Sequence, residues 1–224
     1  MRILGIDTTT KFLSLGLYDD KRVYEYNMDL GKRHSTLLIP TIKRILLALG
    51  WSMEKIDYFA CGLGPGSFTG IRVGLSTIKG ISWSLHKPVV GIPTLDILAS
   101  KVKRDDALIV PVIDAKRGLV YCSIYKRKKG ALKRIAPYML LSQEKLFHKI
   151  KRGSVILGDA LDLYKDKILK NVSGAVILDK DYWYPDGHSI ISLALEKIKN
   201  RMFNTSFDIS PIYLYPKECQ IKKA

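Results

Sequence analysis

Short apolar runs alternate with longer segments of helical periodicity along this chain of 224 residues, and that alternation most constrains its fold. In the first half the predicted elements are strands at 3–6, 12–18, 23–28, 58–63 and 88–92 and helices at 37–49, 68–85 and 95–102. In the second half they are strands at 108–113, 120–125, 132–140, 155–157 and 175–178 and helices at 143–150, 161–169 and 189–199. This order favours a duplicated α/β unit, divided into residues 1–103 and 104–224, over a sandwich or a barrel.

Composition and cysteine usage exclude several classes of protein. Hydrophobic residues make up 47% and charged residues 26% of the chain, as in ordinary globular proteins. No apolar run approaches the roughly 18 residues of a membrane-spanning helix, and the opening MRILGIDTTT is not a secretory signal. An odd number of widely spaced cysteines predicts neither a disulfide framework nor a zinc site: Cys61, Cys122 and Cys219. We therefore expect a cytoplasmic protein with no membrane partner.

The net charge is unusually positive. Lysine and arginine number 37 against 21 aspartate and glutamate residues, which gives +16 at pH 7. Such an excess favours polyanionic partners such as RNA, DNA or an acidic protein surface. The longest basic run is Lys126, Arg127, Lys128 and Lys129, and it predicts either a nucleic-acid contact or a solvated hairpin tip. A lysine-rich genome would give the same charge without any nucleic acid.

The most informative local sequence is GLGPGSFTGIRVGL, at residues 62–75. A predicted strand runs into a glycine-rich turn and then into a helix, where free backbone N–H groups favour an anion. It is not a P-loop, because the Lys-Ser/Thr ending is absent. Gly70 and Gly74 lie on one helical face, although glycine costs about 1 kcal/mol in a helix interior. Close approach by another helix would compensate for that cost, and packing within the monomer is the alternative.

The helix predicted at 37–49 has apolar residues on two faces. Its main stripe follows the 3.6-residue period and contains Leu38, Ile42, Ile45, Leu46 and Leu49. Leu37 and Leu47 lie outside that stripe, at about 100° and 180° from Leu38. Two apolar faces predict two packing partners, the sheet of the same domain and a second chain. Single exposed leucines are nevertheless common.

A polar turn after the first predicted strand carries the best candidates for phosphate chemistry. We predict that phosphate binds to Thr8 and Thr9 together with Gly64 and Gly66 of the glycine-rich turn. Asp7 is predicted to position a metal or a water. The alternative is a turn whose side chains satisfy only local backbone groups. No two histidines have metal-ligand spacing, and no serine lies in a nucleophile-elbow sequence. The frame of a nucleotide-binding fold is thus present without a recognisable catalytic set.

Several segments together resemble the TsaB family, also called YeaZ. They are ILGIDTTT at the start, GLGPGSFTGIRVGLSTIKG in the middle and VIDAKRGLVY in the second half, and the terminal Pro211-Ile212-Tyr213-Leu214 also fits. The resemblance covers nearly the whole chain, and GPGSFTGIRVGLSTIKG is its most specific part. The chain departs from the family pattern at Tyr215, where members often have arginine, and in its high net charge.

The resemblance implies an actin/Hsp70/sugar-kinase (ASKHA) fold, in which two related α/β halves have central mixed sheets flanked by helices. It also implies a non-catalytic scaffold subunit of the bacterial machinery that makes N6-threonylcarbamoyladenosine beside the tRNA anticodon. In that family the protein pairs with its catalytic paralogue TsaD through the first two helices, and the ATPase TsaE completes the assembly. No cofactor is implied, although a nucleotide at the subunit junction is compatible with the family.

The first two helices supply the implied partner surface. Its expected members are Leu37, Leu47, Gly70, Arg72, Gly74 and Thr77. Leucine in place of Gly70 or Gly74 is therefore expected to block pairing and to leave the monomer folded. In the absence of TsaD, the same surface is expected to pair two copies of the chain.

Three expectations concern chemistry. TsaD carries a two-histidine metal motif, and aligning on Gly91 and Ile92 places those histidines at Thr94 and Leu98, so we expect neither a metal site nor peptidase activity. The rival hypothesis is a weak or vestigial nucleotide hydrolase that uses the threonine turn. If the net charge is functional, residues 126–129 contact the tRNA backbone with an affinity that falls as salt rises.

Overall fold

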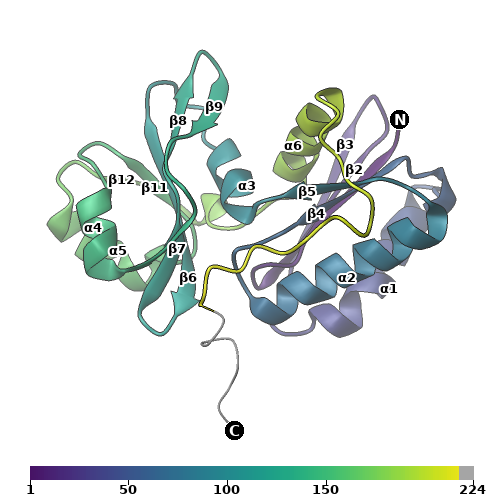
Figure 1. Ribbon diagram of the computed structural model, residues 1–224, viewed down its shortest axis with the longest axis horizontal. Helices are drawn as coiled ribbons and strands as arrows, with labels where there is room; N and C mark the ends of the chain where they lie inside the picture. The colour runs from purple at the N-terminus through teal and green to yellow at the C-terminus, as the bar shows by residue number, and fades with distance from the viewer. Residues whose placement is uncertain (217–224) are drawn as a thin grey trace, which may run out of the picture. The chain divides into compact units, whose positions relative to one another are not determined.

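The computed structural model describes residues 1–216, which form two compact units (Figure 1). The first unit combines Met1–Ile97 with Tyr184–Pro211, and the second combines Leu98–Trp183 with residues 212–216. The predicted boundary after residue 103 lies near Ile97, where the chain passes from the first unit to the second. The prediction did not include the return of the chain to the first unit at Tyr184. No helix within residues 1–216 is long and apolar enough to span a membrane.

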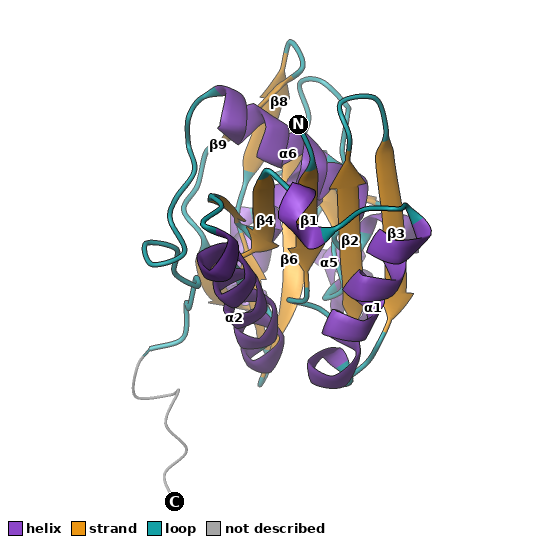
Figure 2. Ribbon diagram, turned by 90° about the vertical axis from the view of Figure 1, so that its right-hand side faces the viewer, coloured by secondary structure: helices purple, strands orange, loops and turns teal. Residues whose placement is uncertain are grey.

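A five-stranded sheet in the order β3-β2-β1-β4-β5 forms the centre of the first unit (Figure 2). β1 is antiparallel to β2 and parallel to β4, and β5 continues the parallel part. The strands are β1 (Ile3–Asp7), β2 (Phe12–Tyr18), β3 (Val23–Asp29), β4 (Tyr58–Gly62) and β5 (Val89–Ile92). The carboxyl ends of the parallel strands meet at one edge of the sheet, where the threonine turn and the glycine-rich turn both begin.

Helices cover both faces of this sheet. α1 (His34–Ala48) and α2 (Phe68–Leu85) lie on one face, and α6 (Gly187–Lys199) lies on the other (Figures 1 and 2). Because side chains alternate along a strand, β1 turns Leu4 and Ile6 toward α1 and α2 and turns Ile3 toward α6. Burial on both faces explains why β1 is apolar along its length up to Asp7.

Glycines let α6 approach the sheet closely. A Cβ atom at Gly16 of β2 would lie 2.3 Å from the carbonyl oxygen of Gly187, and one at Gly187 would lie 2.1 Å from that of Leu15. Ser14 Oγ donates a 2.7 Å hydrogen bond to the carbonyl of Pro185, just before the helix. The helix predicted at 189–199 therefore belongs to the first unit, and it contacts β2 at Gly16 and, through Pro185 just before the helix, at Ser14.

The second unit has a seven-stranded sheet with β6 (Leu108–Lys116) at its centre. The first residues of β6 pair with β8, its later residues pair with β7, and β11 runs parallel to it. The other strands are β7 (Leu119–Cys122), β8 (Tyr125–Lys128), β9 (Ala131–Arg134), β10 (Met139–Ser142), β11 (Val155–Leu157) and β12 (Val176–Ile177).

The remaining helical segments of the two units are α3 (Thr94–Ser100), α4 (Gln143–Lys149), α5 (Leu161–Asn171) and two short 3₁₀ turns, η1 (Met53–Lys55) and η2 (Lys180–Tyr182).

Two strands predicted as continuous are each interrupted. The segment 120–125 contains parts of β7 and β8, and 132–140 contains parts of β9 and β10. Ala136 lies at the break: its N–H donates to the carbonyl of Ile124, and its carbonyl accepts a 2.8 Å bond from Ser123 Oγ. The other predicted elements agree with the structure to within a few residues at their ends.

Candidate functional site

The threonine turn between β1 and β2 is a closed network of hydrogen bonds. Asp7 Oδ1 accepts bonds of 2.8 Å from both the backbone N–H and the hydroxyl of Thr9. The hydroxyl of Thr94 donates to Thr9 Oγ1 at 3.0 Å, and Thr8 Oγ1 donates to the carbonyl of Gly70 at 2.7 Å. Asp7 and the threonines at 8, 9 and 94 have at most 1% of their surface exposed. The polar groups of the turn therefore face the interior of the first unit.

Burial also sets the protonation of Asp7. Removal from water raises the pKa of its carboxyl group to about 6, and the hydrogen bonds from Thr9 and Thr94 oppose that rise. The group therefore changes charge in mildly acidic solution while it stays inside the unit.

The glycine-rich turn and the start of α2 pack directly on the threonine turn. A Cβ atom at Gly70 would lie 2.0 Å from the carbonyl oxygen of Thr8, and one at Gly74 would lie 2.2 Å from Thr8 Oγ1. A Cβ atom at Gly66 would lie 2.4 Å from the carbonyl oxygen of Thr9. These three positions accept no side chain larger than hydrogen without movement of the turn.

The structure contradicts the expected role of two of these glycines in partner binding. Gly70 and Gly74 are buried, and the close approach that they permit is made by Thr8 of the same chain. A leucine at either position would meet the threonine turn inside the monomer. We therefore expect such variants to destabilise the monomer, in place of the expectation that they leave it folded.

The threonine hydroxyls expected to bind phosphate donate to other groups of the chain. The hydroxyls of Thr8 and Thr9 donate within the chain, and the carbonyl of Thr9 accepts a 2.7 Å bond from the N–H of Ser67. The carbonyl of Gly64 accepts a 2.8 Å bond from the N–H of Thr94. The bonds between Thr9 and Asp7 are local, as in the alternative interpretation, whereas Thr8 bonds to Gly70 of α2.

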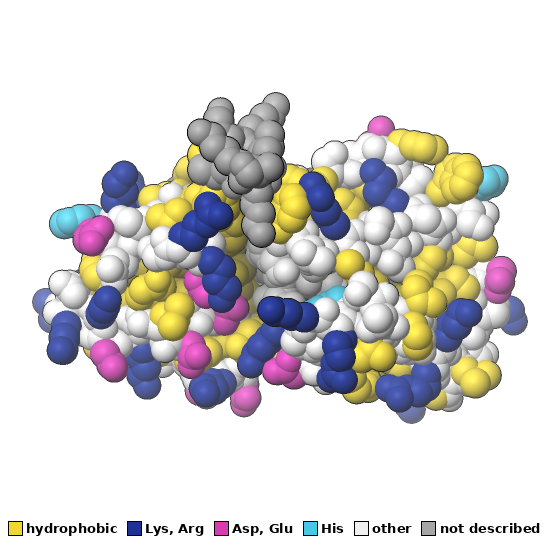
Figure 3. All heavy atoms as spheres, turned by 90° about the horizontal axis from the view of Figure 1, so that it is seen from below, with side chains coloured by type: hydrophobic (Ala, Val, Ile, Leu, Met, Phe, Trp, Pro, Cys, Tyr) yellow, Lys and Arg dark blue, Asp and Glu magenta, His cyan; other side chains and the backbone are white. Residues whose placement is uncertain are grey.

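Exposed apolar side chains lie on the opposite side of the two helices. Leu47 of α1 has 82% of its surface exposed and Trp83 of α2 has 62%, and Ile39 and Phe68 are also exposed. Figure 3 shows hydrophobic side chains scattered over this side of the first unit, in its right-hand half. Gly80 lies on the exposed side of α2, and a Cβ atom there would meet nothing within 4 Å. A glycine in open space inside a helix is less favourable than alanine by about 1 kcal/mol.

The other residues expected at the partner surface differ in exposure. Leu37 is half-buried and packs against the core of the first unit, so Leu47 is the exposed one of the two leucines outside the main stripe of α1. Arg72 is exposed, and its guanidinium lies 3.8 Å from the centre of the Phe68 ring. Thr77 is half-buried. We define the outer α1–α2 face by its exposed members Ile39, Leu47, Phe68, Arg72, Gly80 and Trp83.

Sequence reasoning missed four members of this face, namely Ile39, Phe68, Gly80 and Trp83. The signal for Gly80 was available in the helical period. Gly80 follows Gly74 by six positions, which places the two about 120° apart around the helix. The buried Gly74 and the exposed Gly80 therefore lie on different sides of α2.

The basic run divides between the two sides of β8. Its exposed members are Lys126, Lys128 and Lys129. Arg127 has only 7% of its surface exposed, and its guanidinium donates to the carbonyls of Val102 at 2.7 Å, Ser100 at 3.3 Å and Gly130. The expected contact between Arg127 and tRNA is therefore wrong, because this side chain is part of the interior of the second unit.

No group of three or more metal-ligating side chains occurs within residues 1–216. Thr94 and Leu98, at which the resemblance to TsaD is expected to place the metal-binding histidines of that family, are both fully buried. Cys61 and Cys122 are buried free thiols, and burial raises the pKa of each. Cys219 lies outside the described residues.

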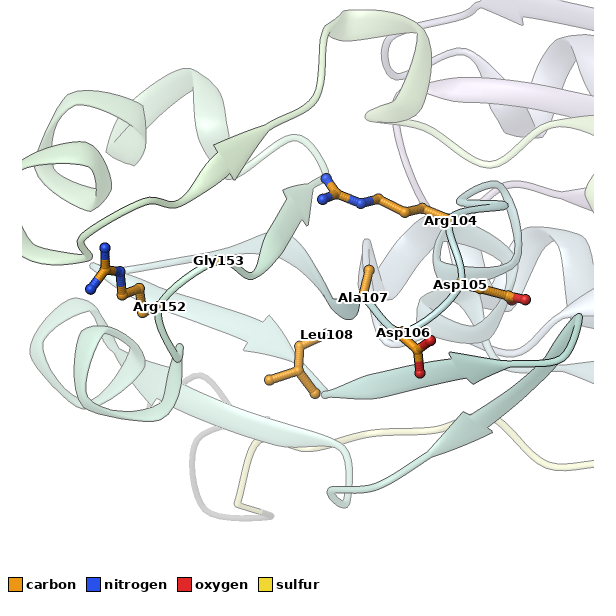
Figure 4. Close-up of a pocket in the computed structure, with 7 residues that line it drawn as sticks. All are labelled: Arg104, Asp105, Asp106, Ala107, Leu108, Arg152 and Gly153. Carbon is orange, nitrogen blue, oxygen red and sulfur yellow. The ribbon is translucent and has the colours of Figure 1, made fainter.

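A pocket of about 270 Å³ lies in the second unit, near the amino ends of β6 and β11 (Figure 4). Its charged lining consists of Arg104, Asp105 and Asp106 on the loop before β6 and Arg152 on the loop before β11. Two carboxylates accompany two guanidinium groups, so the lining has no excess charge that would select an anion or a cation.

Comparison with known proteins places this geometry in a family. A family model described as "TsaD: tRNA N6-adenosine threonylcarbamoyltransferase" matches residues 28–173. A Bacillus subtilis (strain 168) protein named "tRNA threonylcarbamoyladenosine biosynthesis protein TsaB" is 33% identical over 172 residues, 75% of each chain. The chain belongs to the TsaB (YeaZ) family. The TsaB protein of Escherichia coli (strain K12) is 28% identical over 220 residues, which cover 96% of this chain and 94% of that one.

Solved structures of TsaB-like proteins share the fold. YeaZ from Pseudomonas aeruginosa has a TM-score of 0.81 at 22% identity, and the match covers 95% of this chain and all of that one. A protein from the same organism, described as similar to peptidase YEAZ, has a TM-score of 0.84 at 23% identity over 96% of this chain and 99% of that one. The α/β fold of the ASKHA type that the TsaB resemblance implied is confirmed.

Proposed function

We propose that this chain is a scaffold subunit of the machinery that makes threonylcarbamoyladenosine in tRNA, and that its outer α1–α2 face holds a TsaD-like catalytic paralogue. The observation that carries the proposal is the exposed apolar face with open space at Gly80. Absence of a side chain lets a second helix approach closely, since the distance between packed helices depends on the residues at their contact. The names of the curated TsaB relatives and the match to the TsaD family model support the process. The ATPase TsaE completes the proposed assembly.

In this proposal the chain contributes binding rather than catalysis. The carboxylate and hydroxyls of the threonine turn are buried and bonded to one another, and the two positions of the paralogue's metal motif hold Thr94 and Leu98. The chain supplies a firm surface that keeps its partner in an active shape. A nucleotide hydrolase would instead need phosphate to enter the space that Gly66, Gly70 and Thr8 fill.

Co-purification with the TsaD paralogue of the same organism tests the proposal, followed by a threonylcarbamoylation assay from which each subunit is omitted in turn. We expect the two proteins to elute together, tRNA modification to require both, and this chain alone to neither modify tRNA nor hydrolyse ATP. Modification by TsaD at full rate without this chain, or steady ATP hydrolysis by this chain alone, would contradict the scaffold role.

A matched pair of variants locates the partner surface. Leu47→Asp places a charge on the outer α1–α2 face, and we expect it to weaken TsaD binding by about tenfold or more, because apolar contact is replaced by a desolvated carboxylate. Leu163→Asp changes an exposed leucine of α5, where 58% of the side chain is exposed, and should leave binding unchanged. Equal binding by the two variants would exclude this face.

The same face is proposed to pair two copies of the chain when TsaD is absent. Sedimentation of the isolated protein should then show a dimer for the wild type and for Leu163→Asp, and a monomer for Leu47→Asp. Addition of TsaD should replace the homodimer with a heterodimer. A dimer that survives in Leu47→Asp would assign self-association to another surface.

A further inference from the structure

The hairpin of β8 and β9 concentrates positive charge in the second unit. Residues 125–134, here the basic hairpin, contain six basic and no acidic side chains. The basic ones are Lys126, Arg127, Lys128, Lys129, Lys133 and Arg134. Figure 1 shows the hairpin extending beyond the other strands of its unit. We propose that the exposed lysines of this hairpin bind the phosphodiester backbone of RNA.

Strand register gathers the lysines on one face. Lys126 lies directly opposite Lys133, and Lys128 lies opposite Ala131. Paired residues and alternate residues of a strand point to the same side, so the three lysines share a face, and all three are exposed. Like charges directly opposite each other destabilise a strand pair. A polyanion bound to this face would remove that repulsion.

Carboxylates do not neutralise the hairpin. Within residues 1–216, none of its lysines or arginines forms an ion pair with an acidic side chain. Two acidic residues lie on the adjoining loop, and the hairpin uses them through its backbone. Asp105 Oδ1 accepts a 3.2 Å bond from the N–H of Gly130, and the N–H of Asp106 donates to the carbonyl of Arg127 at 2.9 Å. The hairpin's five exposed basic side chains therefore outnumber the two acidic residues of the adjoining loop.

Buried contacts hold the hairpin in place. The guanidinium of Arg127 connects β8 to the carbonyls of Ser100 and Val102 and to the hairpin's own turn. β8 also pairs with the start of β6. Arg134 is positioned by Tyr138, with its guanidinium 4.1 Å from the ring centre. The lysines thus project from a fixed backbone, which lowers the ordering cost of binding.

The spacing of the lysines along β8 suits a phosphate backbone. Alternate residues of a strand are about 6.6–6.8 Å apart, so Lys126 and Lys128 can reach successive negative charges of an extended strand. The choice of RNA rests on the proposed function, in which this chain works in a machinery that modifies tRNA. The hairpin would then hold the body of the tRNA while a partner treats its anticodon loop.

Binding of a fluorescently labelled, unmodified tRNA transcript to the full-length protein tests the inference. The variant K126Q/K128Q/K133Q removes the shared face, and K151Q/K165Q/K170Q removes three other exposed lysines of the same unit and so matches it in net charge. We expect the hairpin variant to lose about tenfold or more in affinity and to reduce the salt slope of log K by about two to three, with a change under about threefold in the control. Thermal unfolding should show neither variant to be less stable than the wild type, because every altered side chain is exposed and the hairpin variant also removes the repulsion between Lys126 and Lys133.

Several outcomes would overturn the inference. The first is absence of tRNA binding by the wild type, and the second is an equal loss of tRNA affinity in the two triple variants. The third is a hairpin variant that keeps its tRNA affinity but no longer binds vesicles rich in phosphatidylserine, which would assign the hairpin to a membrane surface. Co-purification with TsaD separates this inference from the proposed function. The hairpin variant should keep TsaD and lose tRNA, whereas Leu47→Asp should lose TsaD and keep tRNA. Failure of the wild type to bind TsaD, with tRNA binding intact, would refute the scaffold role alone.

Discussion

The glycines of α2 and the basic residues of β8 show the same division between an inner and an outer side. On α2, Gly74 admits the threonine turn, whereas Gly80 faces open space. On β8, Arg127 bonds three carbonyls in the interior, whereas Lys126 and Lys128 on either side of it reach solvent. In both elements one residue type serves two purposes, and the helical or strand period decides which. The inner members stabilise the fold, and the outer members are free for partners.

The largest effect is expected from a side chain forced into the inner side of α2. Gly70→Leu would press against the carbonyl of Thr8, and overpacking of this kind should lower the free energy of unfolding by about 3 kcal/mol or more. Urea unfolding at neutral pH measures the loss. A variant as stable as the wild type would show that Gly70 does not belong to the inner side.

The inner network should also make stability depend on pH through Asp7. Its folded pKa is raised to about 6, so the unfolded chain releases this proton first, and stability falls as pH rises between about 4 and 6. A rise of about two units corresponds to about 3 kcal/mol. Asp7→Asn cannot ionise and should lack this fall. The difference in free energy of unfolding between the variant and the wild type, measured from pH 4 to pH 8, should therefore increase in favour of the variant by about that amount. Parallel pH profiles for the two proteins would contradict a raised pKa.

On β8, loss of the inner arginine should cost more than loss of an outer lysine. Arg127→Gln leaves buried carbonyls without their donors, and we expect it to lower the free energy of unfolding by about 2 kcal/mol. Lys126→Gln should change it by less than about 0.5 kcal/mol, as do most surface substitutions. Similar losses in both variants would erase the distinction between the two sides of the strand.

The smallest effect has the opposite sign. Gly80→Ala places a methyl group in open space and improves helix propensity, so it should stabilise the isolated chain by about 0.5–1 kcal/mol. Gly74→Ala, its matched control on the same helix, should destabilise the chain because its Cβ atom meets Thr8. Thermal unfolding of the two variants compares them directly. A destabilised Gly80→Ala would mean that this position is already in contact.

Local patterns predicted most helices and strands, because the apolar residues recur every 3.6 positions in the helices and every second position in the strands. They also pointed to Leu47 as an apolar residue away from the main stripe of α1. They placed Gly80 on another side of the helix from Gly70 and Gly74, but they did not reveal that Thr8 of the same chain is the neighbour of the buried pair. The inward direction of Arg127 was available from the alternation of β8, where buried Tyr125 precedes it by two positions.

Long-range packing limited the prediction of the units. The helix at Gly187–Lys199 follows the second unit in sequence, and its apolar stripe does not say which sheet it covers. Gly16 in the middle of β2 was the available signal, because glycine inside a strand marks a close approach. Its partner, Gly187, lies too far along the chain for any local pattern to connect the two.

The return of α6 to the first sheet has a consequence for synthesis on the ribosome. The first unit emerges with one face of its sheet uncovered, and its missing helix begins 90 residues after Ile97. At typical elongation rates the nascent chain waits roughly 5–20 s for that helix. During this interval Ile3, Val90 and Ile92, which pack against α6 in the folded protein, lack that helix as a cover. We therefore expect slower translation across residues 98–186 to lengthen the time for which this face is uncovered.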